Sequence, residues 1–293
     1  MAREDGQQRP PSLKGAPWLE SAGTRAVIGA MERGGFAARV VGGAVRNALV
    51  GAPVKDVDIA TTALPQDVIR LAAAAGLGAV PTGLEHGTVT VIASHQPIEV
   101  TTLRRDIATY GRHARVTFTT DWAEDAARRD FTLNALYCDA DGTVHDPLGA
   151  YPDLVARRVR FIGKAEDRIR EDYLRILRFF RFTATYAEGP PDPAGLAASV
   201  ALAPGLAQLS AERVRAELLR LLGAPRAVEV VAVMADAGLI QALIGDRGDV
   251  ALLGRLAAVE AALGRDADPL LLLGALAGGG RALTALGALL RLS

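Results

Sequence analysis

The sequence predicts an α+β fold, in which a head with a mixed sheet and helices precedes an all-α region. Two observations carry this prediction. Short apolar segments with strand character alternate with helical patterns as far as Asp146-Pro147, and beyond that point the chain is rich in Arg, Leu and Ala at helical spacing. The expected parts are a flexible tail (1–20), a head (21–147), a helical neck (148–222) and a helical body (223–293).

The head alternates strands with helices that have recognisable ends. The pair Gly42-Gly43 follows an apolar strand and opens a helix, and Pro65 lies at the start of a helix that stops at Gly76. The predicted order is a helix over 24–35, a strand over 38–41, a helix through 49, a strand carrying Asp56 and Asp58, a helix over 65–75 and hairpin strands over 88–93 and 98–103.

The region after the head has helical patterns. A long one runs from 166 to 186 and is broken by Gly189-Pro190-Pro191. Ser210 is predicted to cap a helix over 211–222, because its hydroxyl can accept a hydrogen bond from an otherwise unpaired first-turn N–H. Further short helices are expected over 226–292. The sequence ends inside an apolar helical pattern, which is typical of a truncated body.

Composition excludes several classes of protein. Half of the 293 residues are hydrophobic, which excludes a mostly disordered chain. The single cysteine, Cys138, excludes an intramolecular disulfide framework and a cysteine-rich zinc site, and it is typical of the cytoplasm. Residues 1–17 lack the apolar core of a signal peptide, and the apolar run 270–277 is too short to span a bilayer, so no membrane association is expected. The sequence leaves the oligomeric state open.

Charge is balanced overall but concentrated locally. The chain carries 33 basic and 33 acidic residues, which argues against indiscriminate electrostatic capture of nucleic acid. Residues 157–181 nevertheless hold eight arginines and one lysine against four acids, a net charge of +5. Such a run is typical either of a solvated helix face or of a surface that binds phosphates.

Asp56 and Asp58 form an Asp-Val-Asp motif shortly after Gly42-Gly43. In a strand, side chains two residues apart point to the same face about 6.7 Å apart along the backbone, so both carboxylates could converge on Mg²⁺. A metal pair can hold the attacking and leaving oxygens of an in-line phosphoryl displacement, and the glycines would let backbone N–H groups approach a triphosphate. Either motif alone is also typical of solvated acids at a strand end or of a plain turn.

A second polar motif spans 128–135 and combines two guanidinium groups, a carboxylate and an amide beside apolar residues. Arg129, Asp130 and Asn134 are its candidate binding residues, because this mixture suits phosphates and a ribose hydroxyl. The alternative is an exposed, salt-bridged helix start.

A third motif runs from Glu171 to Arg181 on the predicted long helix. Asp172 and Arg175 are i and i+3 neighbours and share a face, which Arg178 and Arg181 continue. An ionised Asp only accepts hydrogen bonds and Arg only donates them. The pair could therefore match the edge of cytosine or adenine and leave unpaired groups against uracil and guanine. The alternative is a surface ion pair of little energetic weight.

Together these motifs resemble those of class II tRNA nucleotidyltransferases, the bacterial CCA-adding enzymes of the polymerase-β-like superfamily, over roughly residues 38–222. The segment 42–46 with Asp56 and Asp58 resembles the metal and triphosphate motif. The other matching segments are 128–135 for the ribose-selecting motif, 171–175 for the amino-acid template and 212–218 for the helix-stabilising motif.

The resemblance implies an enzyme that adds CCA to the 3′ end of tRNA from CTP and ATP, with Mg²⁺ as cofactor and pyrophosphate as the second product. It implies that Asp56 and Asp58 bind the metal, with Glu99 as a third carboxylate that helps to ionise the RNA 3′-hydroxyl. Asp172 and Arg175 would read the base. The implied nucleotide contacts are Gly42, Gly43, Arg46, Arg129, Asp130, Asn134, Asp172, Arg175, Arg178 and Arg181.

Two features depart from the family pattern, and a third segment is expected to move during catalysis. Asn47 stands where the family usually has Asp, which keeps size and hydrogen bonding but loses a charge. The helical body is shorter than is usual in the family, so weaker tRNA binding is expected. The segment 101–113 resembles the flexible loop associated with the switch from C to A addition, which is expected to move during catalysis.

Four alternatives stay open at this stage. A bacterial poly(A) polymerase shares the same motifs, although the segment 83–91 resembles the CCA-adding version. A CC-only or A-only enzyme also fits, but the intact loop after Thr101 argues against CC-only addition. Asn47 and the short C-terminus would suit an inactive RNA-binding homologue, which the intact acids argue against. His145-Asp146 suggests an HD phosphohydrolase, but no second His/Asp set accompanies it in the sequence.

Overall fold

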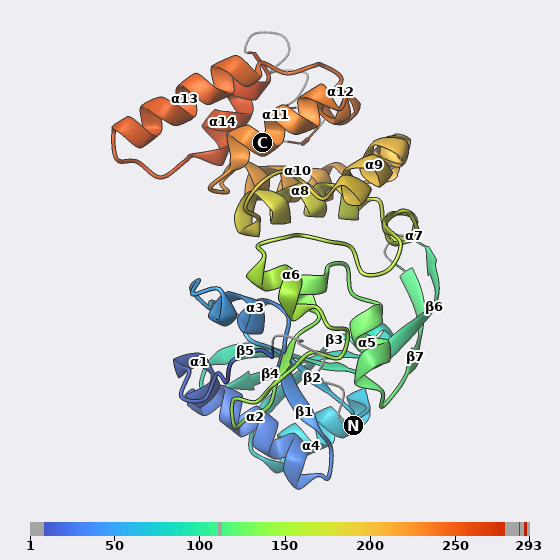
Figure 1. Ribbon diagram of the computed structural model, residues 1–293. Coiled ribbons are helices and arrows are strands. Elements are labelled where there is room, and N and C mark those ends of the chain that lie inside the picture. Colours follow the sequence, from blue (N-terminus) through green and yellow to red (C-terminus); the bar gives the residue numbers. More distant parts are fainter. Residues whose placement is uncertain (1–8, 111–112, 279–286, 288–289, 292–293) are drawn as a thin grey trace, which may run out of the picture. The chain divides into compact units, whose positions relative to one another are not determined.

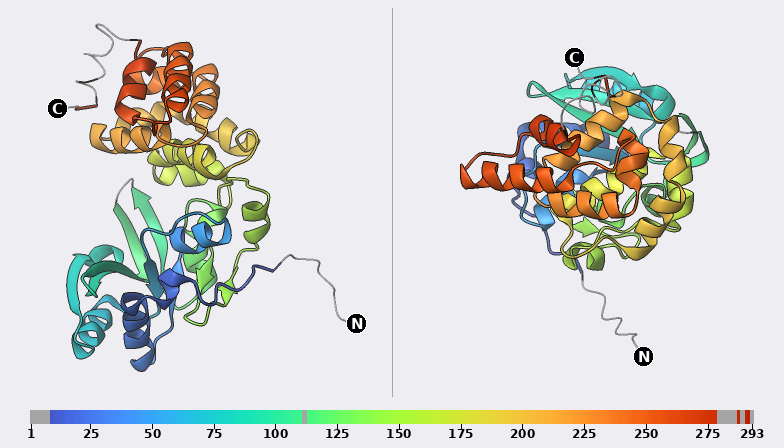
Figure 2. Two further views of the ribbon diagram at one scale, coloured as in Figure 1. Left: turned by 90° about the vertical axis from the view of Figure 1, so that its left-hand side faces the viewer. Right: turned by 90° about the horizontal axis from the view of Figure 1, so that it is seen from above.

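The computed structural model describes residues 9–110, 113–278, 287 and 290–291, and Figure 1 and Figure 2 show its elements. The chain divides into two compact units, Met1–Ala156 and Arg157–Ser293. The first contains the sheets and the second is built from helices, so the predicted α+β class is confirmed. The predicted neck begins in the first unit and joins the body in the second, and the four predicted divisions stay predictions.

The first unit is built on a mixed sheet of seven strands in the order β3-β4-β5-β2-β1-β8-β9. Among these described strands, β2 and β5 are the parallel pair, and the other neighbours run antiparallel. The strands are β1 Ala38–Val41, β2 Asp58–Thr61, β3 Gly78–Gly83, β4 Thr88–Ala93, β5 Gln96–Thr102, β8 Tyr137–Cys138 and β9 Val144–His145. The predicted strands are confirmed, but β2 starts only at Asp58, so Asp56 precedes it.

Helices cover this sheet and close its core. α2 and α4 pack against β4, where Val27 and Met31 of α2 and Val89 and Val91 of β4 are fully buried. The helices are α1 Pro17–Glu20, α2 Ala22–Arg33, α3 Gly43–Leu49, α4 Pro65–Ala74, α5 Trp122–Ala127 and α6 Tyr151–Val155, with short 3₁₀ helices η1 Leu84–His86 and η2 Thr132–Asn134. The helices predicted over 24–35, through 49 and over 65–75 are confirmed.

A separate two-stranded sheet pairs β6 Arg104–Tyr110 with β7 His113–Phe118. It takes up most of the segment 101–113, which resembles a flexible loop in the sequence. Residues 111–112 lie outside the described residues. The segment is therefore an antiparallel hairpin in this structure, and its movement stays a prediction.

The chain ahead of α2 is held to the first unit. Leu13 donates from its backbone N–H to the carbonyl oxygen of Gly142 at 2.8 Å, and Leu19 of α1 is buried. Gly142 has a φ of 90°, and a Cβ at this position would overlap the backbone of Lys14, so this contact requires glycine. Part of the segment predicted as a flexible tail, from Leu13 to Glu20, is therefore held to the first unit, and residues 1–8 lie outside the described ones.

The second unit packs its helices around α8 and α10. Ile176 and Phe180 of α8 and Leu218 and Leu221 of α10 are fully buried. The helices are α7 Ala165–Glu171, α8 Leu174–Tyr186, α9 Pro193–Ala201, η3 Ala203–Gln208, α10 Ala211–Leu222, α11 Ala227–Asp236, α12 Leu239–Ile244, α13 Val250–Ala262 and α14 Pro269–Leu276. In the part of the chain that the structure describes, no helix combines the length and the apolar character needed to cross a membrane.

Two helix predictions in the second unit need correction. The long helix over 166–186 is wrong, because Asp172 has an extended backbone with φ −157° and its Oδ1 accepts a hydrogen bond from the backbone N–H of Leu174 at 3.1 Å. α7 therefore ends at Glu171 and α8 begins at Leu174. Ser210 does hold the N-cap position of α10, but its side chain makes no capping hydrogen bond.

Candidate active site

Asp58 lies beside Glu99 on neighbouring parallel strands. The register pairs Asp58 of β2 with Glu99 of β5, so the two side chains stand on the same face of the sheet. Although Asp58 reaches solvent, the surrounding atoms raise its pKa by desolvation. The charge of Glu99 raises this pKa further, the guanidinium of Arg129 lowers it, and Asp56 adds a smaller increase. The charges of Glu99 and Asp56 therefore act on Asp58 at an edge that a guanidinium also approaches.

Carboxylates are ligands that suit hard, oxygen-seeking cations such as Mg²⁺. Mg²⁺ prefers oxygen ligands, keeps several waters and is usually held by one or two carboxylates together with substrate phosphates. Across the described ranges, no three Asp, Glu, His or Cys side chains gather closely enough to form an all-protein metal site. Asp56 and Asp58 thus suit a site that substrate phosphates complete. The expected strand geometry for the pair is wrong, since Asp56 lies ahead of β2.

A glycine turn adjoins the acidic edge. Val41, the last residue of β1, pairs with Asp58, which places the following Gly42 next to β2. Gly42 has φ 69° and ψ −115°, a backbone conformation that residues with a Cβ rarely adopt. A Cβ at Gly42 would lie 3.7 Å from Nη1 of Arg129. The turn therefore exposes backbone to the guanidinium with no side chain between them, and Gly43 begins α3.

Arg46 of α3 is buried and is held by amide side chains. Its Nη1 donates to Oδ1 of Asn134 at 2.5 Å, and its Nε and Nη2 donate to Oδ1 of Asn47 at 3.1 and 2.9 Å. Nδ2 of Asn134 donates in turn to Oδ1 of Asp130 at 2.9 Å, and Asp130 also accepts from the backbone N–H of Phe131. Three predicted nucleotide-binding residues, Arg46, Asp130 and Asn134, therefore belong to one buried network.

Asn47 uses both ends of its amide. Oδ1 accepts from Arg46, and Nδ2 donates to the carbonyl oxygen of Pro53 at 2.8 Å. A carboxylate at this position could not make the second bond, because it has no N–H to donate. The lost charge is thus accompanied by a bond that ties the turn after α3 back to the helix.

One group that holds Arg129 was not predicted from the sequence. Asp125 of α5 is 1% exposed and accepts hydrogen bonds from Nη2 of Arg129 at 3.0 Å, Nε of Arg128 at 2.8 Å and the Tyr137 hydroxyl at 2.8 Å. Burial raises the pKa of Asp125, but Arg129, Arg128 and the Tyr137 hydroxyl outweigh it and lower that pKa to about 2. The available signal was the spacing of an acid three and four residues before two arginines.

The predicted base-reading residues lie in the second unit, where α7 gives way to α8. Oδ2 of Asp172 accepts from Nη2 of Arg213 at 2.6 Å. Arg175 pairs with Glu171 and donates to the carbonyl oxygen of Arg168 at 2.9 Å. The shared helix face expected for Asp172 and Arg175 is interrupted, because the backbone is extended at Asp172, and the two side chains form separate pairs with Arg213 and Glu171.

Arg178 and Arg181 of α8 share one buried carboxylate. Glu217 of α10 is 3% exposed, and its Oε2 accepts from Nε of Arg181 at 2.6 Å. Nη1 of Arg178 lies 3.9 Å from Oε1 of Glu217. The guanidinium carbons of Arg181 and Arg178 lie 4.4 and 5.3 Å from the centre of the Phe182 ring. Both arginines are therefore held at one side and partly exposed at the other.

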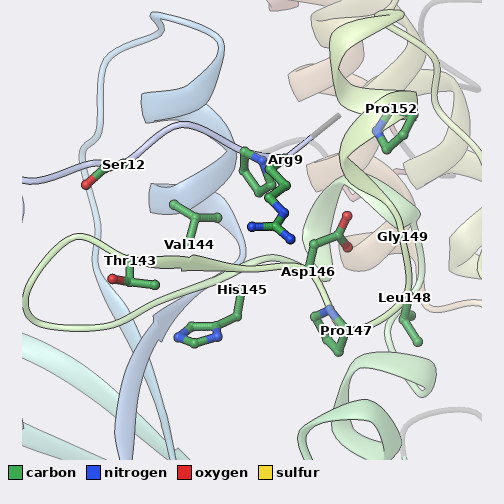
Figure 3. Close-up of a pocket in the computed structure, with 11 residues that line it drawn as sticks. Arg9, Ser12, Thr143, Val144, His145, Asp146, Pro147, Leu148, Gly149 and Pro152 are labelled. Carbon is green, nitrogen blue, oxygen red and sulfur yellow. The ribbon is translucent and has the colours of Figure 1, made fainter. Parts of the chain in front are cut away.

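His145 and Asp146 are both occupied by local bonds. Nε2 of His145 lies 2.5 Å from Oδ2 of Asp139, and Asp146 accepts from the backbone N–H groups of Ala150 and Tyr151 at 2.7 and 2.8 Å. Figure 3 shows the two residues with Arg9 around a cavity of about 730 Å³. Within the described residues they belong to no cluster that could hold a metal, so the phosphohydrolase alternative has no structural support.

Known protein families match both units. A family model described as "Poly A polymerase head domain" matches residues 38–160, and one described as "Probable RNA and SrmB-binding site of polymerase A" matches residues 191–245. The chain is 43% identical over 229 residues to the mitochondrial CCA tRNA nucleotidyltransferase 1 of Danio rerio, covering 76% of this chain and 53% of that protein. It is 39% identical over 236 residues to the CCA-adding enzyme of Geobacillus stearothermophilus, covering 79% and 56%. The chain thus spans about half the length of these curated relatives.

A solved structure extends the likeness over most of the chain. The crystal structure of the Bacillus stearothermophilus CCA-adding enzyme in complex with CTP is 35% identical and aligns with a TM-score of 0.69. The alignment covers 94% of this chain and 70% of the crystallised one. The likeness therefore includes both the sheet unit and the helical unit.

Proposed function

Because this chain belongs to the family of CCA-adding tRNA nucleotidyltransferases and bacterial poly(A) polymerases, we propose that it adds CCA to the 3′ end of tRNA from CTP and ATP. The observation that carries the proposal is the pairing of Asp58 with Glu99 at the edge where Gly42 approaches Arg129. The edge offers carboxylates to a metal and open backbone with a guanidinium to a triphosphate. The choice of substrates is supported by the names of the relatives and by the CTP in the crystallised one.

In the proposed reaction the tRNA 3′-hydroxyl attacks the α-phosphate of CTP, twice in succession, and then that of ATP. Each attack forms a bond between the hydroxyl oxygen and the α-phosphorus, breaks the bond from that phosphorus to the oxygen bridging to the β-phosphate, and releases pyrophosphate, an in-line displacement that two bound metal ions would support. Asp56 and Asp58 would hold Mg²⁺, which when bound stabilises charge on the phosphoryl oxygens and makes the hydroxyl easier to ionise. Glu99, exposed beside Asp58, would act as a third carboxylate that favours loss of the hydroxyl proton.

The nucleotide itself would be held by the residues around the glycine turn. Gly42 and Gly43 leave backbone open to the triphosphate, and Arg46 and Arg129 supply the opposing charge. Asp130 would contact the ribose, and its carboxylate is held in place by Asn134 and by a backbone N–H. Fixed polar groups of this kind bind a nucleotide with less loss of side-chain freedom.

Base selection would fall to Asp172 and Arg175, with Arg178 and Arg181 nearer the phosphates. An ionised carboxylate has about four lone-pair sites. The bonds from Leu174 and Arg213 to Asp172 leave acceptor capacity for the amino group of cytosine or adenine. Uracil and guanine would present a carbonyl oxygen to the same carboxylate, which is unfavourable. A buried Cys138 has no part in this chemistry, because desolvation raises the pKa of its thiol to about 12.

The second candidate function is poly(A) addition. It is favoured by the description of the model that matches residues 38–160, a poly(A) polymerase head. Both activities would use the same carboxylates and the same turn, so they differ only in which 3′ ends and bases are accepted. CC-only and A-only addition are narrower forms of the first proposal. A cytoplasmic location, expected from the sequence, remains part of it.

One experiment separates these outcomes. The protein with Mg²⁺ is incubated with tRNAs ending at the discriminator base, at C and at CC, each with one labelled nucleotide at a time. CCA addition predicts CTP incorporation on the first two ends and a single AMP on the third. Long A tails would replace the proposal with poly(A) addition, and a product that stops at CC would indicate a CC-only enzyme. No Mg²⁺-dependent incorporation with any end would indicate an inactive RNA-binding homologue.

A further inference from the structure

Asp125 joins three segments of the first unit behind the acidic edge. Besides Arg128, Arg129 and the Tyr137 hydroxyl, its Oδ1 accepts from the backbone N–H of Arg104 at 3.3 Å. The carboxylate thus connects α5, the residues that follow it, the start of β6 and β8. One carboxylate faces two guanidinium groups, so the cluster keeps a net positive charge after Asp125 is counted.

One side of the Arg129 guanidinium is hydrogen-bonded to Asp125 and Tyr137, and the other side faces the turn at Gly42. Nη2 is bonded to Asp125, and Nε donates to the Tyr137 hydroxyl at 3.3 Å. Nη1 is the nitrogen that lies 3.7 Å from the Cβ position of Gly42. The side turned away from Asp125 therefore faces the glycine turn.

The Tyr137 hydroxyl bridges the Asp125 carboxylate and the Arg129 guanidinium. It donates to Asp125 while it accepts from Arg129, and the guanidinium carbon lies 5.4 Å from the centre of its ring. Tyr137 is fully buried and meets Trp122 edge to face at 5.2 Å. The ring is thus fixed by packing, and a fixed hydroxyl restricts the plane in which the guanidinium can lie.

We propose that Asp125, acting with the Tyr137 hydroxyl, is a positioning residue that fixes the Arg129 guanidinium toward the Gly42 turn for binding the phosphate or ribose oxygens of the nucleotide. The inference rests on the proposed function and adds to it the group that orients one of its binding residues. An Arg side chain is long and flexible, and its planar fork matches phosphate oxygens only in one orientation. Fixing that orientation beforehand lowers the entropy lost on binding.

The positioning of Arg129 by Asp125 should matter equally for CTP and for ATP. Arg129 would touch parts of the nucleotide that CTP and ATP share. Loss of its positioning should therefore weaken the binding of both nucleotides by the same factor. Changes at Asp172, in contrast, should alter the preference among bases. A merely structural role for Asp125 would lower the folded fraction and leave the KM of the folded protein unchanged.

The test uses the full chain and steady-state kinetics with Mg²⁺, CTP on tRNA ending at the discriminator base and ATP on tRNA ending at CC. Asp125→Asn removes the charge, and Tyr137→Phe removes only the hydroxyl. Asp121→Asn is the matched control, because it removes an exposed carboxylate from the same helix and Asn is an equally good N-cap. We expect the KM for both nucleotides to rise about tenfold in Asp125→Asn and about threefold in Tyr137→Phe, on the scale of one charged and one weaker hydrogen bond. The control should stay within about twofold.

An unchanged KM for both nucleotides in Asp125→Asn and Tyr137→Phe would overturn the inference, whatever happens to the melting temperature. A rise for one nucleotide only would also overturn it. If Asp125→Asn does not fold, Tyr137→Phe decides alone. If the wild type incorporates neither nucleotide, the proposed function fails, and calorimetric titration of the same proteins with CTP and Mg²⁺ tests the positioning separately. The dissociation constant should then rise by the same factors, and equal constants would contradict it.

Discussion

Asp58 of β2 stands opposite Glu99 of the parallel strand β5, and the pKa of Asp58 is raised. Desolvation is the first cause, and the charge of Glu99 is the second. Two carboxylates placed side by side without a cation repel each other. Such a pair costs folding stability, and this cost is expected where the protein needs the charges for binding a metal.

The first prediction is that Asp58→Asn stabilises the metal-free protein at pH 7. A carboxyl group with a pKa above its ordinary value of 3.8 favours the protonated form in the folded state, so its ionisation destabilises the fold as pH rises through the raised pKa. The gain should be at most about 1 kcal/mol, because Asp58 reaches solvent. Urea unfolding with a chelator present measures it. The gain should vanish below pH 3.8, and a less stable variant at pH 7 would contradict the proposed repulsion.

The second prediction concerns Asp125, whose pKa is lowered to about 2. A lowered folded-state pKa means that the ionised carboxylate stabilises the fold above its ordinary value of 3.8, and that this contribution is lost as pH falls toward 2. Asp125→Asn should therefore cost about 2 kcal/mol at pH 7 and progressively less between pH 4 and pH 2. Chemical unfolding across this range measures the difference. A cost that is independent of pH would show that packing, and not charge, is what Asn disturbs.

The third prediction is that Asn47 contributes through hydrogen bonds rather than through charge. Asn47→Ala removes the bonds to Arg46 and to the Pro53 carbonyl, and the KM for CTP should rise about fivefold, the equivalent of about 1 kcal/mol. Asn47→Asp loses the Pro53 bond but offers Arg46 a charged acceptor. Its KM should stay within about threefold of the wild type. A large loss of activity in Asn47→Asp with an unchanged Asn47→Ala would reverse this interpretation.

The fourth prediction is that Glu217 stabilises the second unit. Its removal in Glu217→Ala would leave Arg181 without its 2.6 Å acceptor, and we expect a loss of about 2 kcal/mol in the free energy of unfolding. Arg220→Ala is the matched control, because Arg220 is 66% exposed and lies 3.4 Å from the same carboxylate. That variant should lose less than about 0.5 kcal/mol. Equal losses in the two variants would contradict a special weight for the bond between Glu217 and Arg181.

Much of the first unit could be predicted from local sequence. Val40 and Val41 before Gly42-Gly43 indicate a buried strand that turns into a helix, and the turn has the positive φ that only glycine adopts easily. Glu99 could be suggested as a third carboxylate only by family resemblance. Its place opposite Asp58 depends on the pairing of β2 with β5, which are separated by about 40 residues along the chain.

The features that the sequence did not predict depend on contacts between distant residues or, at Asp172, on a side chain that competes with the helix for a backbone N–H. The helical pattern of apolar residues continues through Ile169, Leu174 and Leu177, so it hides the break that the side chain of Asp172 makes. Asp125 meets Tyr137 only because α5 packs beside β8, and no periodicity reports such a contact. The pairing of Asp172 with Arg213 likewise joins two helical segments 41 residues apart.

The central claim is that the protein transfers a nucleotide to tRNA and needs the carboxylates at the edge of β2 to do so. It is tested most directly by single-turnover incorporation of labelled CMP onto tRNA ending at the discriminator base, with Mg²⁺, in the wild type and in Asp58→Asn. The wild type should extend the tRNA, and the variant should be slower by at least about a thousandfold, since several kcal/mol of charge stabilisation would be lost. Incorporation at the same rate in both proteins would contradict the claim, because a neutral amide in place of the Asp58 carboxylate cannot supply the charge that a metal requires.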